Sequence, residues 1–206
     1  MQNRQIEQLT QQVLERMFVE LEASARHVHV TQEQAMKLFG HALTPDRPLS
    51  QPGQYLAKER VRVVGPKGEF SHVAVLGPAR KEAQVEVSMT DARALGLQPP
   101  IRESGKVSGS PGVVLSGSNG SIALQSGVII AQRHLHLTPE AAERFGVQDK
   151  QVVKLQTFTD RPVIFEDVLV RVRPDFATRA HLDFDEANAC AMKKGDLGRI
   201  LPCEPS

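Results

Sequence analysis

Apolar and polar positions alternate in the same way in two stretches about half the chain apart. Residues 25–39 read ARHVHVTQEQAMKLF, and residues 132–146 read QRHLHLTPEAAERFG. In each stretch His alternates with Val or Leu, as on a strand, where residues i and i+2 face the same side. An amphipathic segment follows, which predicts a helix. A repeat at this distance indicates a duplicated architecture built on an Arg-His-x-His strand–helix motif.

The start and end of each predicted helix are marked in the sequence. In the first copy, Thr31 and Gln34 have the spacing of a capping box, in which each side chain binds the other's backbone N–H. Gly40 lies just past the apolar residues and can end the helix. In the second copy the corresponding residues are Thr138, Pro139 at the first helical position, and Gly146. Each His pair is therefore expected at the end of a strand, directly before a helix.

Residues 1–17 have a helical periodicity of their own. Ile6, Leu9, Val13 and Met17 recur at steps of three and four, between Gln, Arg and Glu. So short a helix is marginal alone and needs a surface to pack against. One interpretation is a helix that lies on its own domain, and the other is a helix that docks on another protein.

The rest of the chain is rich in short apolar segments separated by turns. A strand pattern begins at residue 18 and runs to residue 30. Residues 41–59 are expected to be irregular, and strands follow from residue 61 onward. Residues 179–188 are expected to continue as strand, with His181 alternating with Leu182 and Phe184. Many short strands at regular spacing predict a mainly-β barrel or sandwich.

Composition narrows the range of partners. The 206 residues are 40% hydrophobic, with a net charge of +1 and interspersed charges, which disfavours nucleic-acid binding. No apolar run is long enough to span a membrane, and no secretory signal is evident. Cys190 and Cys203 form no disulfide framework and are expected to be free thiols in a reducing cytoplasm, rather than metal ligands.

The two His pairs are candidate metal ligands. A single His-x-His on a strand is more often two solvated histidines, but a second copy with the same flanks favours metal binding. A zinc ion takes three or four N, S or O ligands, so each pair needs at least one more. Glu86 on a polar strand face and His181 are candidates, although each alone could be an ordinary surface or hydrogen-bonded residue. Arg80 follows Gly-Pro-Ala in a turn, where an exposed arginine is usually only solvated.

The first copy also matches the spacing of the first cupin metal motif, His27-x-His29-x3-Glu33-x6-Gly40. In a cupin the Glu lies further along the sheet. Here Glu33 would lie in the helix that Thr31 caps and would point away from the His pair. A cupin is therefore disfavoured.

Several motifs together resemble those of the PduL-type phosphate acyltransferases, also called phosphotransacylases. They run in family order from about residue 24 to residue 191 and read SARHVHVT, LFG, LSQPG, LGPAR, QVEVS, RHLHLTPEAA and HLDFDEANA. The resemblance implies two intertwined β-barrels with short capping helices, at residues 18–131 and 132–203. Strand 18–25 is a candidate for pairing with the second barrel. Residues 1–17 resemble the amphipathic extension that directs some members into bacterial microcompartments.

The resemblance also implies roles for seven residues. It implies two zinc ions in a dinuclear site between the barrels, with coenzyme A as a substrate, and an arginine that faces phosphate. The implied ligands are His27, His29 and Glu86 in one set and His134, His136 and His181 in the other, and the implied phosphate-facing residue is Arg80.

The implied activity is zinc-dependent, reversible transfer of a short acyl group, propanoyl or acetyl, between coenzyme A and inorganic phosphate. Two alternatives stay open: a zinc-dependent thioester hydrolase, and a non-catalytic shell or scaffold protein with structural metals. The expected location is the bacterial cytoplasm inside a microcompartment, as a homodimer or larger assembly, with residues 1–17 binding shell or core enzymes.

Overall fold

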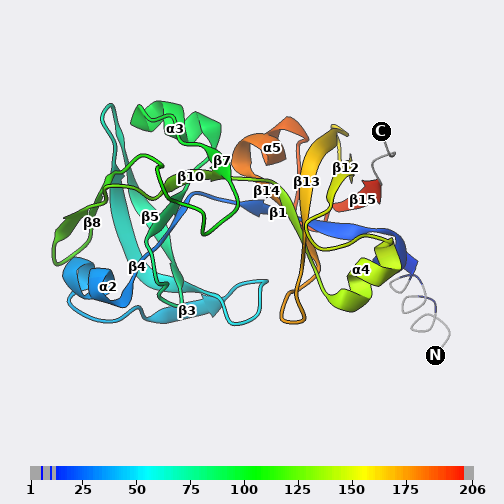
Figure 1. Ribbon diagram of the computed structural model, residues 1–206, viewed down its shortest axis with the longest axis horizontal. Helices are drawn as coiled ribbons and strands as arrows, with labels where there is room; N and C mark the ends of the chain where they lie inside the picture. The colour runs from blue at the N-terminus through cyan, green and yellow to red at the C-terminus, as the bar shows by residue number, and fades with distance from the viewer. Residues whose placement is uncertain (1–5, 7–9, 11–12, 202–206) are drawn as a thin grey trace. The chain divides into compact units, whose positions relative to one another are not determined.

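Two compact units make up the chain in the computed structural model, which describes Ile6, Thr10 and residues 13–201. The first unit comprises the residues up to Ser24, Arg133–Leu182, and the residues from Glu186 onward. The second comprises Ala25–Gln132 and Asp183–Asp185. The chain therefore begins in the first unit, builds the second, and returns. Both units are mainly β, as predicted, and carry short helices (Figure 1).

The first unit is a closed six-stranded barrel. Its strands are connected in the order β1-β14-β11-β13-β12-β15, and β1 pairs with β15 to close the ring. Their inward side chains, among them Leu135 and Leu155, are fully buried and form the core. The strands are β1 (Val19–Ser24), β11 (His134–Leu137), β12 (Val152–Phe158), β13 (Ile164–Val172), β14 (Arg179–Asp183) and β15 (Leu197–Leu201), and helix α4 (Pro139–Phe145) follows β11.

The second unit is a curled nine-stranded sheet. Its order is β7-β10-β6-β2-β5-β4-β8-β9, with β3 paired to β4. Helices α2 (Gln32–Phe39) and α3 (Met89–Leu95) belong to the same unit as this sheet (Figure 1). The strands are β2 (His27–His29), β3 (Pro45–Pro48), β4 (Tyr55–Val64), β5 (Glu69–Gly77), β6 (Gln84–Glu86), β7 (Ile101–Arg102), β8 (Val114–Ser116), β9 (Ser121–Ala123) and β10 (Val128–Ala131).

The predicted helix ends are confirmed in both copies of the motif. Thr31 Oγ1 accepts a hydrogen bond from Gln34 N at 3.1 Å, and Gln34 Oε1 accepts one from Thr31 N at 2.9 Å. Thr138 caps α4 in the same position. Both helices end at a glycine in the left-handed region, Gly40 with φ 80° and Gly146 with φ 64°. These caps fix the point where each helix leaves its His-bearing strand.

The two copies also share one pairing scheme. In the second unit, β2 lies between β5, which is parallel to it, and β6, which is antiparallel. In the first unit, β11 lies between the parallel β13 and the antiparallel β14. The apolar residues between and after the histidines, Val28, Val30, Leu135 and Leu137, are fully buried, as the alternation predicts.

Three expected elements differ in the structure. The strand expected over 18–30 is broken between Ser24 and His27, where the chain leaves the first unit for the second. Residues 41–59, expected to be irregular, contain β3 and the start of β4. The prolines of β3 fit because that strand pairs only with β4, and an edge strand tolerates a missing N–H.

The strand expected over 179–188 ends at Asp183. Helix α5 (Phe184–Ala189) begins directly after it, and Phe184 is 42% exposed instead of alternating into a sheet. Asp185 and Glu186 lie in the first turn, where carboxylates favour a helix start through the helix dipole.

Within the described part of the chain, no helix is long and apolar enough to cross a membrane.

Candidate metal and phosphate site

The first cluster is formed by His27, His29 and Glu86 within the second unit. Strands β2 and β6 are antiparallel neighbours, and their register places His27 directly opposite Glu86. The ligating atoms of the three side chains lie within 4.8 Å of one another, and all three residues are buried. His27 Nε2 is 3.5 Å from Glu86 Oε1. Two histidines from one strand and a carboxylate from the next therefore share one face.

Backbone carbonyls orient both rings of this cluster. His27 Nδ1 lies 2.8 Å from the carbonyl oxygen of Ala25, and His29 Nδ1 lies 3.2 Å from that of Leu76. A carbonyl only accepts hydrogen bonds, so a neutral ring carries its proton on Nδ1 there. The lone pair is then on Nε2, which is the tautomer that binding a metal through Nε2 requires.

The charges around this cluster favour a bound cation. Burial opposes ionisation of Glu86, yet His27, His29 and the Ser104 hydroxyl hold the pKa of this carboxyl well below its usual range. Burial also opposes protonation of His27, but Glu86 outweighs it and raises the His27 pKa. Burial, His27 and Arg80 together lower the pKa of His29 well below its usual value. The cluster thus keeps an ionised carboxylate beside a neutral imidazole.

The second cluster is formed by His134, His136 and His181 within the first unit. His134 lies directly opposite His181 across the antiparallel pair β11–β14. The ring centroids are 4.6 Å apart for His134 and His136, and 4.7 Å for His136 and His181. Burial is the largest influence on the His136 pKa and lowers it, and the neighbouring His134, His181 and arginines lower it further. His136 is therefore kept neutral, as an imidazole that binds a metal ion must be.

Buried His136 has no hydrogen-bond partner for either ring nitrogen among the described residues. A buried imidazole without a partner is costly unless something outside the chain satisfies it. The three-nitrogen set of this cluster and the two-nitrogen, one-oxygen set of the other are both known zinc donor sets. The residues present in each cluster therefore fit a zinc ion.

Arg80 lies within a hydrogen-bond network that includes Glu86. Its backbone N–H donates to the carbonyl of Val30 at 2.9 Å, which ties this turn to the end of the His-bearing segment. Its Nη1 donates to Ser104 Oγ at 3.2 Å, and Ser104 Oγ donates to Glu86 Oε1 at 3.0 Å. The Ser104 hydroxyl thus links the Arg80 side chain to Glu86 of the first cluster.

The sequence patterns single out neither the buried Gln84 nor the half-buried Ser104 as a member of this network. Gln84 had a usable signal, because it lies two residues before Glu86 and therefore on the same strand face. Ser104 lies after β7, and no spacing in the sequence connects it to Glu86.

The arginine of each motif has a structural role. Both guanidinium groups pair with a carboxylate at 2.6 Å and lie over a phenylalanine ring, which fixes the start of the His-bearing strand. Arg26 pairs with Asp91 and lies over Phe70, and Arg133 pairs with Glu186 and lies over Phe165.

The glutamate of the cupin-like motif, an aspartate of α5 and the described cysteine lie outside the clusters. Glu33 is exposed and pairs with Lys37 Nζ at 2.7 Å, and the cupin arrangement is therefore absent from the described residues. Asp185 accepts hydrogen bonds from Ser88 Oγ and Thr90 N at the start of α3, and acts there as a capping group. Cys190 is a buried free thiol, and Cys203 lies outside the described residues.

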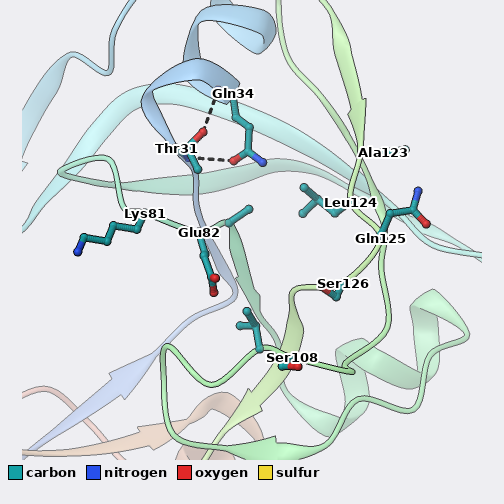
Figure 2. A pocket seen from close by; sticks show the side chains of 11 residues that line it. Thr31, Gln34, Lys81, Glu82, Ser108, Ala123, Leu124, Gln125 and Ser126 are labelled. Carbon is teal, nitrogen blue, oxygen red and sulfur yellow. Dashed lines mark hydrogen bonds between the residues drawn. The ribbon is translucent and has the colours of Figure 1, made fainter.

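A polar pocket of about 510 Å³ opens beside the start of α2 (Figure 2). Thr31 and Gln34, hydrogen-bonded to each other, lie on one side of it, and Ser108 and Ser126 lie on another. The residues that line it include neither Arg80 nor any member of the two histidine clusters. The pocket therefore carries none of the chemistry described above.

These features define a mainly-β protein with two three-residue clusters suited to metal ions and an arginine beside one of them. A family model described as phosphate propanoyltransferase matches residues 20–193. Proteins named phosphate propanoyltransferase are similar over most of their length. The one from Listeria monocytogenes is 50% identical over 198 residues, covering 95% of this chain and 93% of its own.

The relatives from Leptotrichia buccalis and Thermotoga maritima are both 54% identical. The first similarity covers 87% of this chain and 86% of the relative, and the second covers 86% of each. The chain belongs to the phosphate propanoyltransferase family and is an acyltransferase.

Proposed function

We propose that this acyltransferase transfers a propanoyl or acetyl group reversibly between coenzyme A and inorganic phosphate, with one zinc ion held by each histidine cluster. The observation that carries the proposal is the pair of three-residue clusters, each built from the two histidines of one motif copy and one residue of a neighbouring strand. His27, His29 and Glu86 would hold one ion, and His134, His136 and His181 the other. Family resemblance adds the expectation that both ions serve one reaction.

Three protein ligands for each ion support a catalytic rather than a structural role. Structural zinc sites are usually closed by four protein ligands, whereas catalytic sites keep a position for substrate. When bound, zinc would polarise the thioester carbonyl and stabilise the departing thiolate. A shell or scaffold protein with purely structural metals would not need these open positions.

Arg80 would bind the phosphate that accepts the acyl group. A guanidinium presents two parallel N–H donors that match two oxygens of a phosphate, and it offsets the negative charge. Ser104 holds the Arg80 side chain through the 3.2 Å hydrogen bond and links it to Glu86. Because the Arg80 side chain is held in this way, phosphate bound to it would be oriented beside the first cluster.

The acyl group would pass directly from sulfur to phosphate oxygen. A new C–O bond forms, the C–S bond breaks, and coenzyme A leaves as the thiolate. Ser104 donates to Glu86, but a carboxylate whose pKa is held well below its usual range is a weak base. Burial raises the pKa of the Cys190 thiol, which makes it a poor nucleophile. Neither the Ser104 hydroxyl nor the Cys190 thiol is therefore activated to form an acyl-enzyme.

The test is a coenzyme A release assay with propanoyl-CoA and acetyl-CoA, run with and without phosphate and with and without a chelator. We expect release to require both phosphate and metal, and acyl phosphate to accumulate in equal amount. Release without phosphate would instead indicate a thioester hydrolase. A covalent acyl adduct on Ser104, detected by mass spectrometry after acyl-CoA addition without phosphate, would contradict direct transfer.

We also propose that residues 1–17 direct the enzyme into a bacterial microcompartment. Val13 and Met17, two described members of the predicted apolar stripe, are each 48% exposed. An exposed apolar stripe on a short helix gains stability by docking on a partner. Deleting residues 1–17 should preserve turnover and abolish encapsulation of a fused fluorescent reporter. If the truncated enzyme instead loses activity and thermal stability, the helix belongs to the fold.

A further inference from the structure

We propose that Gln84 is a positioning residue for the first metal cluster, and that its side-chain amide orients Glu86 and joins it to the segment carrying Ser104. This inference rests on the proposed zinc-binding role of the cluster. It concerns a residue that contacts a proposed ligand and is not one itself.

Gln84 belongs to a group of four side chains on two neighbouring strands, together with the three residues of the first cluster. Strand β2 supplies His27 and His29, and strand β6 supplies Glu86 and Gln84. The antiparallel register pairs His27 with Glu86 and His29 with Gln84. Residues two apart on a strand share a face, so all four side chains project to one side. Gln84 is 2% exposed, which excludes a solvated surface role.

Hydrogen bonds fix which end of the Gln84 amide faces Glu86. The backbone N–H of Gly105 donates to Gln84 Oε1 at 2.6 Å, and a backbone N–H can only donate. The opposite end is therefore the NH₂ group, which donates to Glu86 Oε1 at 2.5 Å and to Ser104 Oγ at 2.8 Å. With its oxygen already engaged, Gln84 acts as a donor to the carboxylate rather than as a metal ligand.

The second cluster has a different residue at the corresponding position. There the residue opposite His136 is Arg179, whose guanidinium pairs with Glu20 at 3.0 Å. The third ligand of that cluster is an imidazole, whereas that of the first is a carboxylate. A carboxylate can turn and can bind through either oxygen, so a fixed donor at one oxygen restricts its orientation. Gln84 supplies that donor only where the cluster contains a carboxylate.

The consequence is a measurable effect on metal affinity. Loss of a hydrogen-bond partner behind a metal ligand typically weakens metal binding about 10- to 100-fold. Gln84→Met removes all three polar contacts while keeping a side chain of similar length. We expect zinc to bind the first cluster of this variant about 10- to 100-fold more weakly, with the second cluster unaffected.

The experiment measures zinc affinity of the metal-free full chain by competition with a chromophoric chelator. Gln84→Met is made in two backgrounds. His136→Ala disables the second cluster, so that the first is measured alone, and His29→Ala does the reverse. We expect the affinity loss in the His136→Ala background only. Gln98→Met, the same change at an exposed position, is the matched control and should alter neither affinity.

Each outcome decides the inference. Unchanged affinity in the His136→Ala background would overturn it, and so would an equal loss in both backgrounds, which would indicate general destabilisation. If Gln84→Met fails to fold, Gln84→Asn, which keeps an amide too short to reach both Glu86 and Gly105, replaces it and should also weaken binding. Absence of zinc binding in the parent His136→Ala protein would instead refute the proposed metal role of the cluster.

Discussion

Replacing Arg80 by Lys tests whether its planar fork, rather than its charge alone, recognises phosphate. Lysine keeps a positive charge near the first cluster but loses the two parallel donors. Because Arg80 is none of the six proposed ligands, zinc content should stay unchanged. We therefore expect a higher KM for phosphate and a lower kcat, with little change in the KM for acyl-CoA.

The expected magnitude follows from the lost contact. A hydrogen bond to a charged group contributes about 1.5–3 kcal/mol. At about 1.4 kcal/mol for each tenfold change in rate, kcat/KM for phosphate should fall by about 10- to 150-fold. The hydrogen bond to Ser104 at 3.2 Å is also lost in its present geometry, which loosens the same side chain further.

The assay is coenzyme A release at saturating acyl-CoA over a range of phosphate concentrations, with zinc content measured on the same samples. Arg62→Lys is the matched control, because Arg62 is an exposed arginine of the second unit that pairs with Glu69 at 3.7 Å. Phosphate kinetics identical in Arg80→Lys and Arg62→Lys would refute the phosphate-binding role of Arg80. Loss of zinc from Arg80→Lys would show that the residue supports the cluster instead.

Three further predictions concern the metal, the core and pH. His136→Ala should reduce zinc content from two ions to one per chain and abolish turnover, whereas elemental analysis of the exposed His72→Ala should match the parent protein. Leu135→Ala, fully buried in the barrel core, should lower the free energy of unfolding by about 2–5 kcal/mol in urea denaturation, with Ile164→Ala, 51% exposed, as the near-neutral control. Although burial opposes its ionisation, hydrogen bonds from Thr90 and Ser88 lower the Asp185 pKa, so ionised Asp185 stabilises the fold above its ordinary pKa of about 3.8. The stability lost in Asp185→Asn should therefore be largest at neutral pH and shrink as pH falls below that value; a constant difference would contradict it.

Much of the fold follows from local patterns in the sequence. The capping box of Thr31 and Gln34 and the glycine at position 40 need only neighbouring residues, and the structure contains all three interactions. The alternation around His27 and His134 depends only on the two-residue period of a strand. These predictions succeeded because the physical cause lies within a few residues of the effect.

The elements that the sequence predicts wrongly depend on residues far away in the chain. The local pattern near Ser24 does not mark the point where the chain passes from one unit to the other, because that break depends on which strands each segment pairs with. Only the family resemblance makes strand 18–25 a candidate for pairing with the second barrel. Pro45 and Pro48 disfavour a strand in general, and only the edge position of β3 makes one acceptable. Phe184 alternates with Leu182 in sequence, which predicts a strand continuing to residue 188, but helix α5 begins at Phe184 itself.

The candidate site follows the same division. Periodicity shows that His27 and His29 share a face, but only strand register decides that Glu86, 59 residues past His27, lies opposite. From the sequence, Glu86 and His181 are candidate ligands, and only the family resemblance assigns each of them to a cluster. The register also places Gln84 opposite His29 and Arg179 opposite His136, which are corresponding positions of the two copies. The different contacts of Gln84 and Arg179 could not be inferred from the repeat. A duplicated motif thus predicts two similar sites, while the neighbouring strands, which do not repeat in sequence, determine how those sites differ.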